Sequence, residues 1–250
     1  MLRIPLTATT LSRAARAVRS LGSVALLILV SASSVPAWAA PPRHALYHPV
    51  RTSIAALIPA SRALPDDRKA ELQQLAAYMN DRRAAKKPVN LLFICTHNSR
   101  RSHIAQLWAS VAAAYFDLNG IAAYSGGTEV SAFNPRAVAA LRRAGFLIDG
   151  GGDGANPHYQ VTFAAGQVPM ELFSKKYSDA SNPQSDFVAV MTCAQADESC
   201  PLVEGAALRV PLHYEDPKAA DGTPGEDATY DARVRQIGSE MLYLFARIRR

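Results

Sequence analysis

The stretch Val89–Ser102 reads V-N-L-L-F-I-C-T-H-N-S-R-R-S and decides the fold of the chain. Its first six residues are almost all apolar, which is typical of a short strand buried on both faces of a parallel sheet. Cys95 stands where this strand should end. Arg101 follows six residues later, and Ser102 is a good N-cap for the amphipathic segment that contains Ile104. The sequence therefore predicts a strand, a tight polar loop and the N-terminus of a helix.

This arrangement brings backbone N–H groups of the loop and of the first helical turn to one point. The helix dipole favours negative charge at the same place. Arg101 adds a guanidinium whose fork matches a tetrahedral oxyanion, and the positive field should favour the thiolate form of Cys95. A buried structural cysteine is the alternative interpretation. The strand, loop and helix around Cys95 favour a nucleophile at the base of an oxyanion site.

The motif C-T-H-N-S-R-R-S resembles the Cys-x5-Arg-Ser loop of low-molecular-weight protein tyrosine phosphatases and of arsenate reductases built on the same fold. The resemblance runs from about residue 89 to the C-terminus. It implies that Cys95 is the nucleophile and that Arg101 and the loop bind the oxyanion. The remaining loop residues with this implied role are Thr96, His97, Asn98, Ser99, Arg100 and Ser102. His97 replaces a glycine usual in the family, and because histidine reaches positive φ more readily than most residues, we expect the loop to be kept.

Further predicted strands alternate with helices. The strands are Ile121–Ser125, Phe187–Met191 and Leu208–Leu212, a helix starts at Asn134–Pro135 and ends at Gly145, and the last helix covers about 228–245. This order predicts an α/β fold with right-handed crossovers and the site at the carboxyl ends of the strands. With the resemblance, the expected architecture is a three-layer sandwich around a four-stranded parallel sheet, the low-molecular-weight tyrosine phosphatase fold, with an N-terminal helical extension. The segment Asp149–Pro183 contains a possible hairpin through 159–163 and 171–177, and its residues decide neither for a lid nor for a simple insertion.

Two further cysteines follow the strand Phe187–Met191. Cys193 comes directly after it, and Cys200 lies seven residues later. In an exported protein the two could form a structural disulfide. Alternatively, a disulfide could pass from Cys95–Cys193 to Cys193–Cys200 by thiolate attack on sulfur. A zinc site completed by His213 is a weaker interpretation, because the chain has only three cysteines. The segment A-D-E-S-C-P resembles the resolving-cysteine segment of thioredoxin-coupled arsenate reductases, which favours the relay.

The dipeptide Asp216-Pro217 in H-Y-E-D-P resembles the family's Asp-Pro loop, which carries a general acid. A carboxylic acid facing Cys95 could protonate a departing oxygen, whereas an aspartate before proline is also common in turns. In the phosphatases of the family, aromatic residues typically follow the Asp-Pro. Here the sequence 218–220 is K-A-A, which is a second indication against a phosphotyrosine substrate.

The N-terminal segment 1–40 carries much of the net charge of +6. Four of the 27 basic residues lie there without any acidic residue. The rest of the chain has 23 basic and 21 acidic residues, and this small excess does not indicate a nucleic-acid-binding protein. The basic start, the apolar run Leu21–Val30 and the A-W-A-A ending predict a secretory signal peptide. The apolar run is too short for a comfortable membrane span, so we expect none after cleavage.

Three regions are thus expected: a signal peptide at 1–40, a linker with one helix at 41–88, and the enzyme domain at 89–250. Pro41–Ala63 has no clear period and is interpreted as a linker or a loosely docked arm. Asp66–Arg83 is predicted to be a helix, because acidic residues favour its N-terminus and basic ones its C-terminus. The predicted location is exported and periplasmic, or cytoplasmic if the start site is mis-assigned. Cell fractionation distinguishes the two.

The favoured function is a thiol-dependent arsenate reductase that uses Cys95, Cys193 and Cys200 in turn, with a thioredoxin-like reductant implied by the resemblance. The first alternative is a protein tyrosine or small aryl ester phosphatase acting through a phosphocysteine. The second is an exported oxyanion-binding protein without turnover. The presence of Cys95 argues against it, because a binding protein needs no nucleophile. No metal or organic cofactor is implied. A thiol relay needs a reductant, whereas exported proteins usually meet an oxidising compartment, and this conflict stays open.

Overall fold

The computed structural model describes residues 45–250, so the predicted signal peptide lies outside the described residues. The helices are α1 (His48–Arg62), α2 (Asp66–Ala84), α3 (Arg101–Tyr115), α4 (Pro135–Arg143), α5 (Ala194–Ser199) and α6 (Glu226–Phe245). The strands are β1 (Val89–Cys95), β2 (Ile121–Gly127), β3 (Leu147–Gly150), β4 (Tyr159–Thr162), β5 (Met170–Leu172), β6 (Phe187–Met191) and β7 (Ala206–Pro211). None of the helices within this range is long and apolar enough to span a membrane.

The predicted four-stranded parallel sheet is confirmed, with the strand order β2-β1-β6-β7. Strand β1 is central, and its pairing with β2 ends at Cys95 opposite Gly127. Parallel strands deliver their carboxyl ends to one edge of a sheet. The residues that follow β1, β2, β6 and β7 therefore lie close together, and this edge holds the predicted site.

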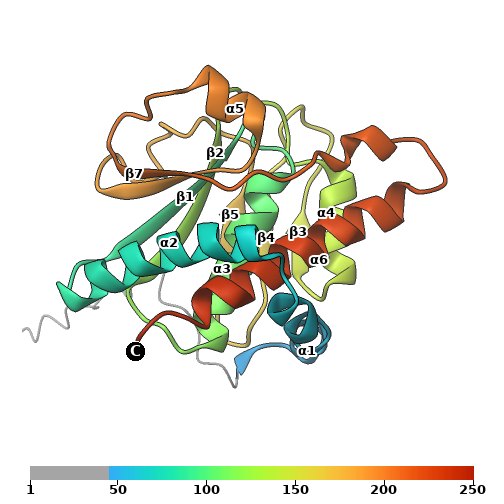
Figure 1. Cartoon of the computed structure of the whole chain (residues 1–250). Coiled ribbons are helices and arrows are strands. Elements are labelled where there is room, and N and C mark those ends of the chain that lie inside the picture. Colours follow the sequence, from blue (N-terminus) through green and yellow to red (C-terminus); the bar gives the residue numbers. More distant parts are fainter. Residues whose placement is uncertain (1–44) are drawn as a thin grey trace, which may run out of the picture. The chain divides into compact units, whose positions relative to one another are not determined.

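Helices cover both faces of the sheet, as Figure 1 shows. Leu91 and Phe93 of β1 face the larger core, to which α1, α2, α3, α4 and α6 contribute. Leu92 and Ile94 face a smaller cluster that includes residues of β6 and α5. This alternation follows from the period of two in a strand. Since both faces of β1 are buried, its residues are apolar on both faces.

The N-terminal extension is more ordered than we expected. The predicted helix is confirmed as α2, which packs against α6. The linker interpretation of Pro41–Ala63 is wrong for its second half, because α1 occupies His48–Arg62 and packs against α6. Its buried residues include Val50, Ile54 and Leu57, spaced as one helix face requires. Prolines at both ends hide this pattern, although proline is tolerated in a first helical turn.

The segment Asp149–Pro183 forms most of a second sheet, which is antiparallel with the order β3-β4-β5. The predicted hairpin is confirmed as β4 and β5, although β5 is shorter than predicted and ends at Leu172. Strand β3 was not predicted. It pairs with β4 from Leu147 to Gly150, and only Ile148 of its four residues is buried. Such a pattern gives little hydrophobic signal in the sequence.

Both predicted ends of α4 are confirmed. The Asn134 side chain accepts a hydrogen bond from the Arg136 N–H at 2.9 Å, and Gly145 follows α4 with φ +101°. The prediction that Ser102 caps α3 is wrong. Helix α3 begins at Arg101, its N-cap is Arg100, and no side chain caps it. Ser102 is fully buried inside the first turn, where its hydroxyl is used by the loop.

Candidate active site

The loop between β1 and α3 is built around the side chain of Asn98, which is fully buried. Asn98, and not His97, takes the left-handed conformation, with φ +44°. Asparagine reaches this region more readily than most residues, so the turn does not depend on a glycine. The Asn98 Nδ2 group donates to Ser102 Oγ at 2.9 Å, and Oδ1 accepts from the Lys175 N–H at 3.0 Å. The loop is therefore fixed from inside.

The outer side of the loop is held by the segment that follows β5. Ser174 Oγ donates to the His97 carbonyl at 2.8 Å, beside the bond from the Lys175 N–H to Asn98. Strand β2 approaches equally closely, because a Cβ on Gly127 would lie 2.7 Å from the Asn98 nitrogen. The end of the Asp149–Pro183 segment thus supports the oxyanion loop, a role that the sequence did not reveal.

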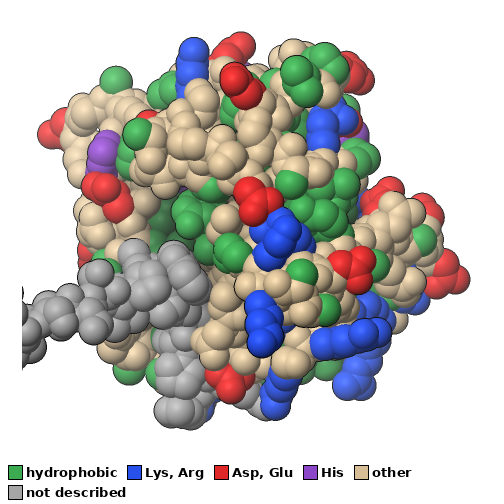
Figure 2. Space-filling view, turned by 90° about the vertical axis from the view of Figure 1, so that its left-hand side faces the viewer, with side chains coloured by type: hydrophobic (Ala, Val, Ile, Leu, Met, Phe, Trp, Pro, Cys, Tyr) green, Lys and Arg blue, Asp and Glu red, His purple; other side chains and the backbone are tan. Residues whose placement is uncertain are grey.

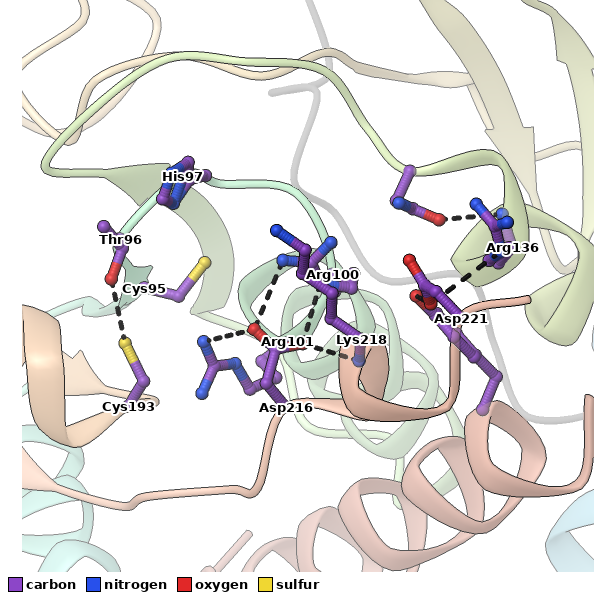
Figure 3. A network of polar contacts seen from close by, with 12 residues as sticks. Cys95, Thr96, His97, Arg100, Arg101, Arg136, Cys193, Asp216, Lys218 and Asp221 are labelled. Atoms are coloured by element: carbon purple, nitrogen blue, oxygen red, sulfur yellow. Dashed lines mark hydrogen bonds and ion pairs between the residues drawn. The ribbon is translucent and has the colours of Figure 1, made fainter. Parts of the chain in front are cut away.

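Cys95 lies at the base of this loop and is 3 % exposed. Its Sγ atom is 3.1 Å from Ser102 Oγ. Because the Ser102 oxygen already accepts a hydrogen from Asn98 Nδ2, its own single hydrogen is free to point at the sulfur. The Ser102 hydroxyl is thus placed to hydrogen-bond to the Cys95 sulfur. In Figure 3 the Cys95 sulfur points toward the space that the loop encloses.

Two guanidinium groups at the end of the loop hold Asp216 between them (Figure 3). Arg101 Nη2 donates to Asp216 Oδ2 at 2.9 Å, and its Nη1 donates to the Tyr214 carbonyl at 2.9 Å. Arg100 Nε lies 2.8 Å from Asp216 Oδ1. The Nε of Arg101 is buried and has no hydrogen-bond partner within residues 45–250. The other nitrogens of the Arg101 guanidinium are engaged by Asp216 and by the Tyr214 carbonyl.

The carboxyl group of Asp216 is held in its ionised form. Burial alone would raise its pKa, but the charges of Arg101 and Arg100 outweigh burial and lower it. Asp216 Oδ1 also accepts a hydrogen bond from the Lys218 N–H at 3.1 Å, so it caps the short 3-10 helix Pro217–Ala220. The structure thus brings Asp216 to the loop but turns it to the two arginines. Asp216 must therefore take up a proton before it could act as a general acid.

The other loop residues line the rim or the wall of the site. The imidazole of His97 is partly exposed, with Nε2 3.5 Å from a Glu129 carboxylate oxygen. Ser99 is buried, and its carbonyl accepts a hydrogen bond from the Asn134 N–H at 2.9 Å. Thr96 Oγ1 lies 3.5 Å from the sulfur of Cys193, so this loop residue contacts that thiol.

All three thiols share the smaller hydrophobic cluster. Cys95 and Cys193 are among its buried members, and Cys200 packs against it. All three are free in this structure. Cys193 is the N-cap of α5, where its sulfur accepts a hydrogen bond from the Ala196 N–H at 3.4 Å. Cys200 follows the last residue of α5 and donates to the Leu202 carbonyl.

Helix α5 separates Cys193 from Cys200. Seven residues at a rise of 1.5 Å place their Cα atoms about 10 Å apart, whereas a disulfide needs about 4.4–6.8 Å. A bond between them therefore requires α5 to unwind. Asp197 in the middle of α5 contacts two residues outside it: its Oδ2 lies 3.0 Å from His213 Nε2, and its carbonyl accepts from Arg209. Within residues 45–250 no three His, Cys, Asp or Glu side chains are placed to hold a metal ion.

Arg68 of α2 is a site-supporting residue that the sequence analysis missed. Its Nη2 donates to the His213 carbonyl at 3.0 Å, and its guanidinium lies over the Tyr214 ring. Its Nε donates to Glu240, whose side chain is 1 % exposed. A signal did exist, because Glu240 stands at helical spacing from the apolar residues Ile237 and Leu244 in the last predicted helix, and a buried carboxylate implies a cationic partner.

His103 lies directly beneath the loop and is fully buried. It stacks on Phe133, with ring centroids 4.1 Å apart, and its Nδ1 is 3.1 Å from Ser125 Oγ. Burial lowers its pKa far below the usual value, and the nearby Lys175 lowers it further. His103 is thus neutral and serves as packing under the nucleophile loop rather than as a base.

Comparison with known proteins gives a consistent result. No protein-family model matches the chain. An arsenate reductase of Bacillus licheniformis is 29% identical over 160 residues, which are 62% of this chain and 94% of that protein. An arsenate reductase of Oceanobacillus iheyensis is 27% identical over 158 residues, which are 63% of this chain and 94% of that protein. Among solved structures, a low molecular weight phosphotyrosine phosphatase from Vibrio cholerae O395 matches at 16% identity and a TM-score of 0.42, covering 62% of this chain and 94% of its own.

The sequence similarity to these two arsenate reductases extends over 94% of each relative. The chain also has the four-stranded parallel sheet and the Cys95–Arg101 loop described above. The chain thus resembles a thiol-dependent oxyanion enzyme in its sequence, its sheet and the composition of its loop.

Proposed function

We propose that this protein reduces arsenate to arsenite by a relay of its three cysteines. The observation that carries the proposal is the shared environment of the thiols: Cys95, Cys193 and Cys200 all contribute to one small cluster beside the oxyanion loop. A simple hydrolase needs only the first of them. The names of the two sequence relatives support the same choice. Arsenate is the substrate, and a thioredoxin-like dithiol protein is the proposed reductant.

The first step uses Cys95, Arg101 and Asp216. An arsenate dianion enters the loop and accepts hydrogen bonds from the loop N–H groups and from Arg101 Nε. When Arg101 turns to the anion, Asp216 loses a cation and gains an anionic neighbour, so it takes up a proton. The Cys95 thiolate then attacks arsenic, an arsenic–sulfur bond forms, and one oxygen leaves as water with the proton from Asp216.

The second step transfers electrons to arsenic. The Cys193 thiolate attacks the Cys95 sulfur, a disulfide forms, the arsenic–sulfur bond breaks and its electron pair reduces As(V) to As(III). Cys193 lies on the Thr96 side of the loop, close to this path. Cys200 then attacks the Cys193 sulfur, releases Cys95 and leaves a Cys193–Cys200 disulfide. Because α5 lies between these two residues, the helix unwinds in this step, and the external dithiol then reduces the disulfide.

A phosphatase is the second candidate, and one observation favours it. Helix α5 keeps Cys193 and Cys200 too far apart for a disulfide in this structure, while the Cys95 loop and Asp216 suffice for a phosphocysteine that water hydrolyses. The reductase and the phosphatase share their first half. They differ only in what attacks the covalent intermediate.

Replacing Cys193 or Cys200 by serine separates the two functions. We expect each variant to lose thioredoxin-dependent arsenate turnover by at least about a hundredfold, because each removes one exchange step. Hydrolysis of an aryl phosphate by both variants should stay within about twofold of the wild type, since the loop and Asp216 are intact. The measurement is steady-state turnover of arsenate with thioredoxin and its reductase, beside hydrolysis of para-nitrophenyl phosphate. A wild type without arsenate turnover would reject the reductase.

Replacing Asp216 by asparagine should lower turnover and tighten anion binding at once. Loss of the general acid costs about 10²–10⁴-fold in turnover. The variant no longer competes with the oxyanion for Arg101, which we expect to strengthen inhibition by arsenate or phosphate about threefold to tenfold. The matched control is Glu215→Gln, which removes one negative charge from the neighbouring residue. Weaker anion binding by Asp216→Asn than by the control would contradict the competition.

The same variant has a pH signature. The folded state lowers the pKa of Asp216, so the carboxylate stabilises the fold above its unfolded pKa of about 3.9 and loses this effect as pH falls through the folded pKa. The difference in melting temperature between wild type and Asp216→Asn should therefore be present at pH 7 and shrink below about pH 4. A difference that is independent of pH would show that the two arginines do not hold the charge.

A further inference from the structure

A second cavity lies at the opposite edge of the sheet from the Cys95 loop. It has a volume of about 570 Å³ and is formed by the end of α2, the residues just before β1 and β2, and the last residues of the chain. Pro88 and Gly120 mark the amino ends of β1 and β2 in its wall. Because the oxyanion loop follows the carboxyl end of β1, the two sites are separated by the length of that seven-residue strand.

Five basic side chains line this cavity, and no Asp or Glu side chain is among its described lining residues. The five are Arg83, Lys86, Lys87, Arg249 and Arg250. Figure 2 faces the side of the protein on which α2 ends, and several Lys and Arg side chains gather below its centre. The segment 1–44 contains no Asp or Glu at all, so its side chains cannot neutralise the cavity wherever they lie. An anion is the natural occupant.

The cavity is also partly organised in advance. Arg83 is fixed because its Nε donates to the Arg249 carbonyl at 3.0 Å and its Nη1 donates to the Asn119 carbonyl. The carbonyl groups at the end of α2 are themselves occupied: the Lys86 N–H bonds to the Arg83 carbonyl and the Lys87 N–H to that of Arg82. These bonds hold the backbone of Lys86 and Lys87 against the end of α2.

The neighbouring Arg82, unlike the cations that line the cavity, is neutralised by a carboxylate. Its two Nη atoms contact both carboxylate oxygens of Asp186, at 2.6 and 2.7 Å. Lys87 lies near enough to Asp186 to help lower the pKa of that carboxyl, after the larger contribution of Arg82. Since one carboxylate serves both cations, a surplus positive charge remains beside the cavity.

We propose that this cavity binds a small polyphosphate, that is, a chain of two or more linked phosphate groups. Its volume is within the usual range of small-molecule sites. A concave wall fits a compact anion better than it fits a flat membrane surface. Its described lining residues include no aromatic ring on which a nucleobase could stack, so the phosphate chain and not a base is recognised.

The test is calorimetric titration of the full chain with inorganic tripolyphosphate, in an excess of inorganic phosphate that occupies the Cys95 loop. The informative variant is the double substitution Lys86→Gln and Lys87→Gln, and both side chains are exposed. The matched control is Arg51→Gln with Arg235→Gln, which removes the same charge from exposed helix positions elsewhere. We expect the lysine variant to bind at least about tenfold more weakly and the control to bind as the wild type does. Unchanged melting temperatures verify that both variants are folded.

Three results would overturn the proposal. The first is a wild type that does not bind tripolyphosphate under these conditions. The second is equal weakening in the lysine variant and the control, which would mean attraction by net charge alone. The third is binding to vesicles of phosphatidylglycerol that depends on the two lysines while tripolyphosphate does not compete, which would assign the surface to a membrane. None of these outcomes depends on whether arsenate is reduced at Cys95.

Discussion

Replacing Cys95 by serine should lower both arsenate reduction and aryl phosphate hydrolysis by at least about four orders of magnitude. Both candidate reactions begin with attack by the Cys95 sulfur, and a serine hydroxyl in its place is a far weaker nucleophile at neutral pH. Ser102 Oγ contacts the sulfur, and Asn98 Nδ2 in turn donates to Ser102 Oγ. Steady-state assays of the two reactions, with purified wild type and variant side by side, measure the effect.

Oxyanion binding distinguishes loss of chemistry from loss of the site. The Cys95→Ser variant keeps the loop N–H groups and Arg101, so we expect it to bind phosphate within about tenfold of the wild type. Residual turnover above one hundredth of the wild-type rate would mean that another group attacks the substrate. That result would remove the basis of both proposed mechanisms, because each passes through a covalent bond to Cys95.

Replacing Arg68 by alanine should cost about 3–5 kcal/mol of folding free energy, because it leaves the Glu240 carboxylate buried without its cation. Arg68 Nε and Glu240 Oε2 are 2.9 Å apart, and the Glu240 side chain is 1 % exposed. For a domain of this size, each kcal/mol shifts the melting temperature by about 2–4 °C, so a decrease of roughly 6–20 °C is expected. Thermal unfolding followed by circular dichroism measures it.

A double variant isolates the ion pair from the other contacts of Arg68. Replacing Arg68 by methionine and Glu240 by leucine removes both charges together, and we expect it to recover most of the lost stability. The double variant still lacks the bond to the His213 carbonyl and the cation over Tyr214, so its turnover should stay reduced. An Arg68→Ala protein as stable as the wild type would show that water or another residue compensates Glu240.

The elements around Cys95 could be predicted because their signals are local. A continuous apolar run indicates a strand buried on both faces, and the polar residues after Ile94 indicate a loop. The orientation of Arg101 could not be predicted in this way. It depends on Asp216, which is 115 residues away in sequence, and no pattern near the loop shows that this carboxylate faces two arginines.

The errors have equally specific causes. Pro49 and Pro59 suggested a linker, but α1 tolerates the first within its initial turn and the second near its end. Ser102 is a favourable N-cap by type, yet its hydroxyl is used inside the loop by Asn98 and Cys95. The function of Arg68 depends on tertiary contacts with α6, so the helical pattern of α2 alone could not reveal it.

The contacts of Ser174 and Lys175 with the oxyanion loop join residues 77 positions apart. Closing a chain segment of that length costs entropy that only a nearly complete fold can offset. The curvature of C-T-H-N-S-R-R-S is therefore fixed by Asn98 within it and also by neighbours that are distant in sequence. We therefore expect the loop to keep its shape only while the segment after β5 is docked against it.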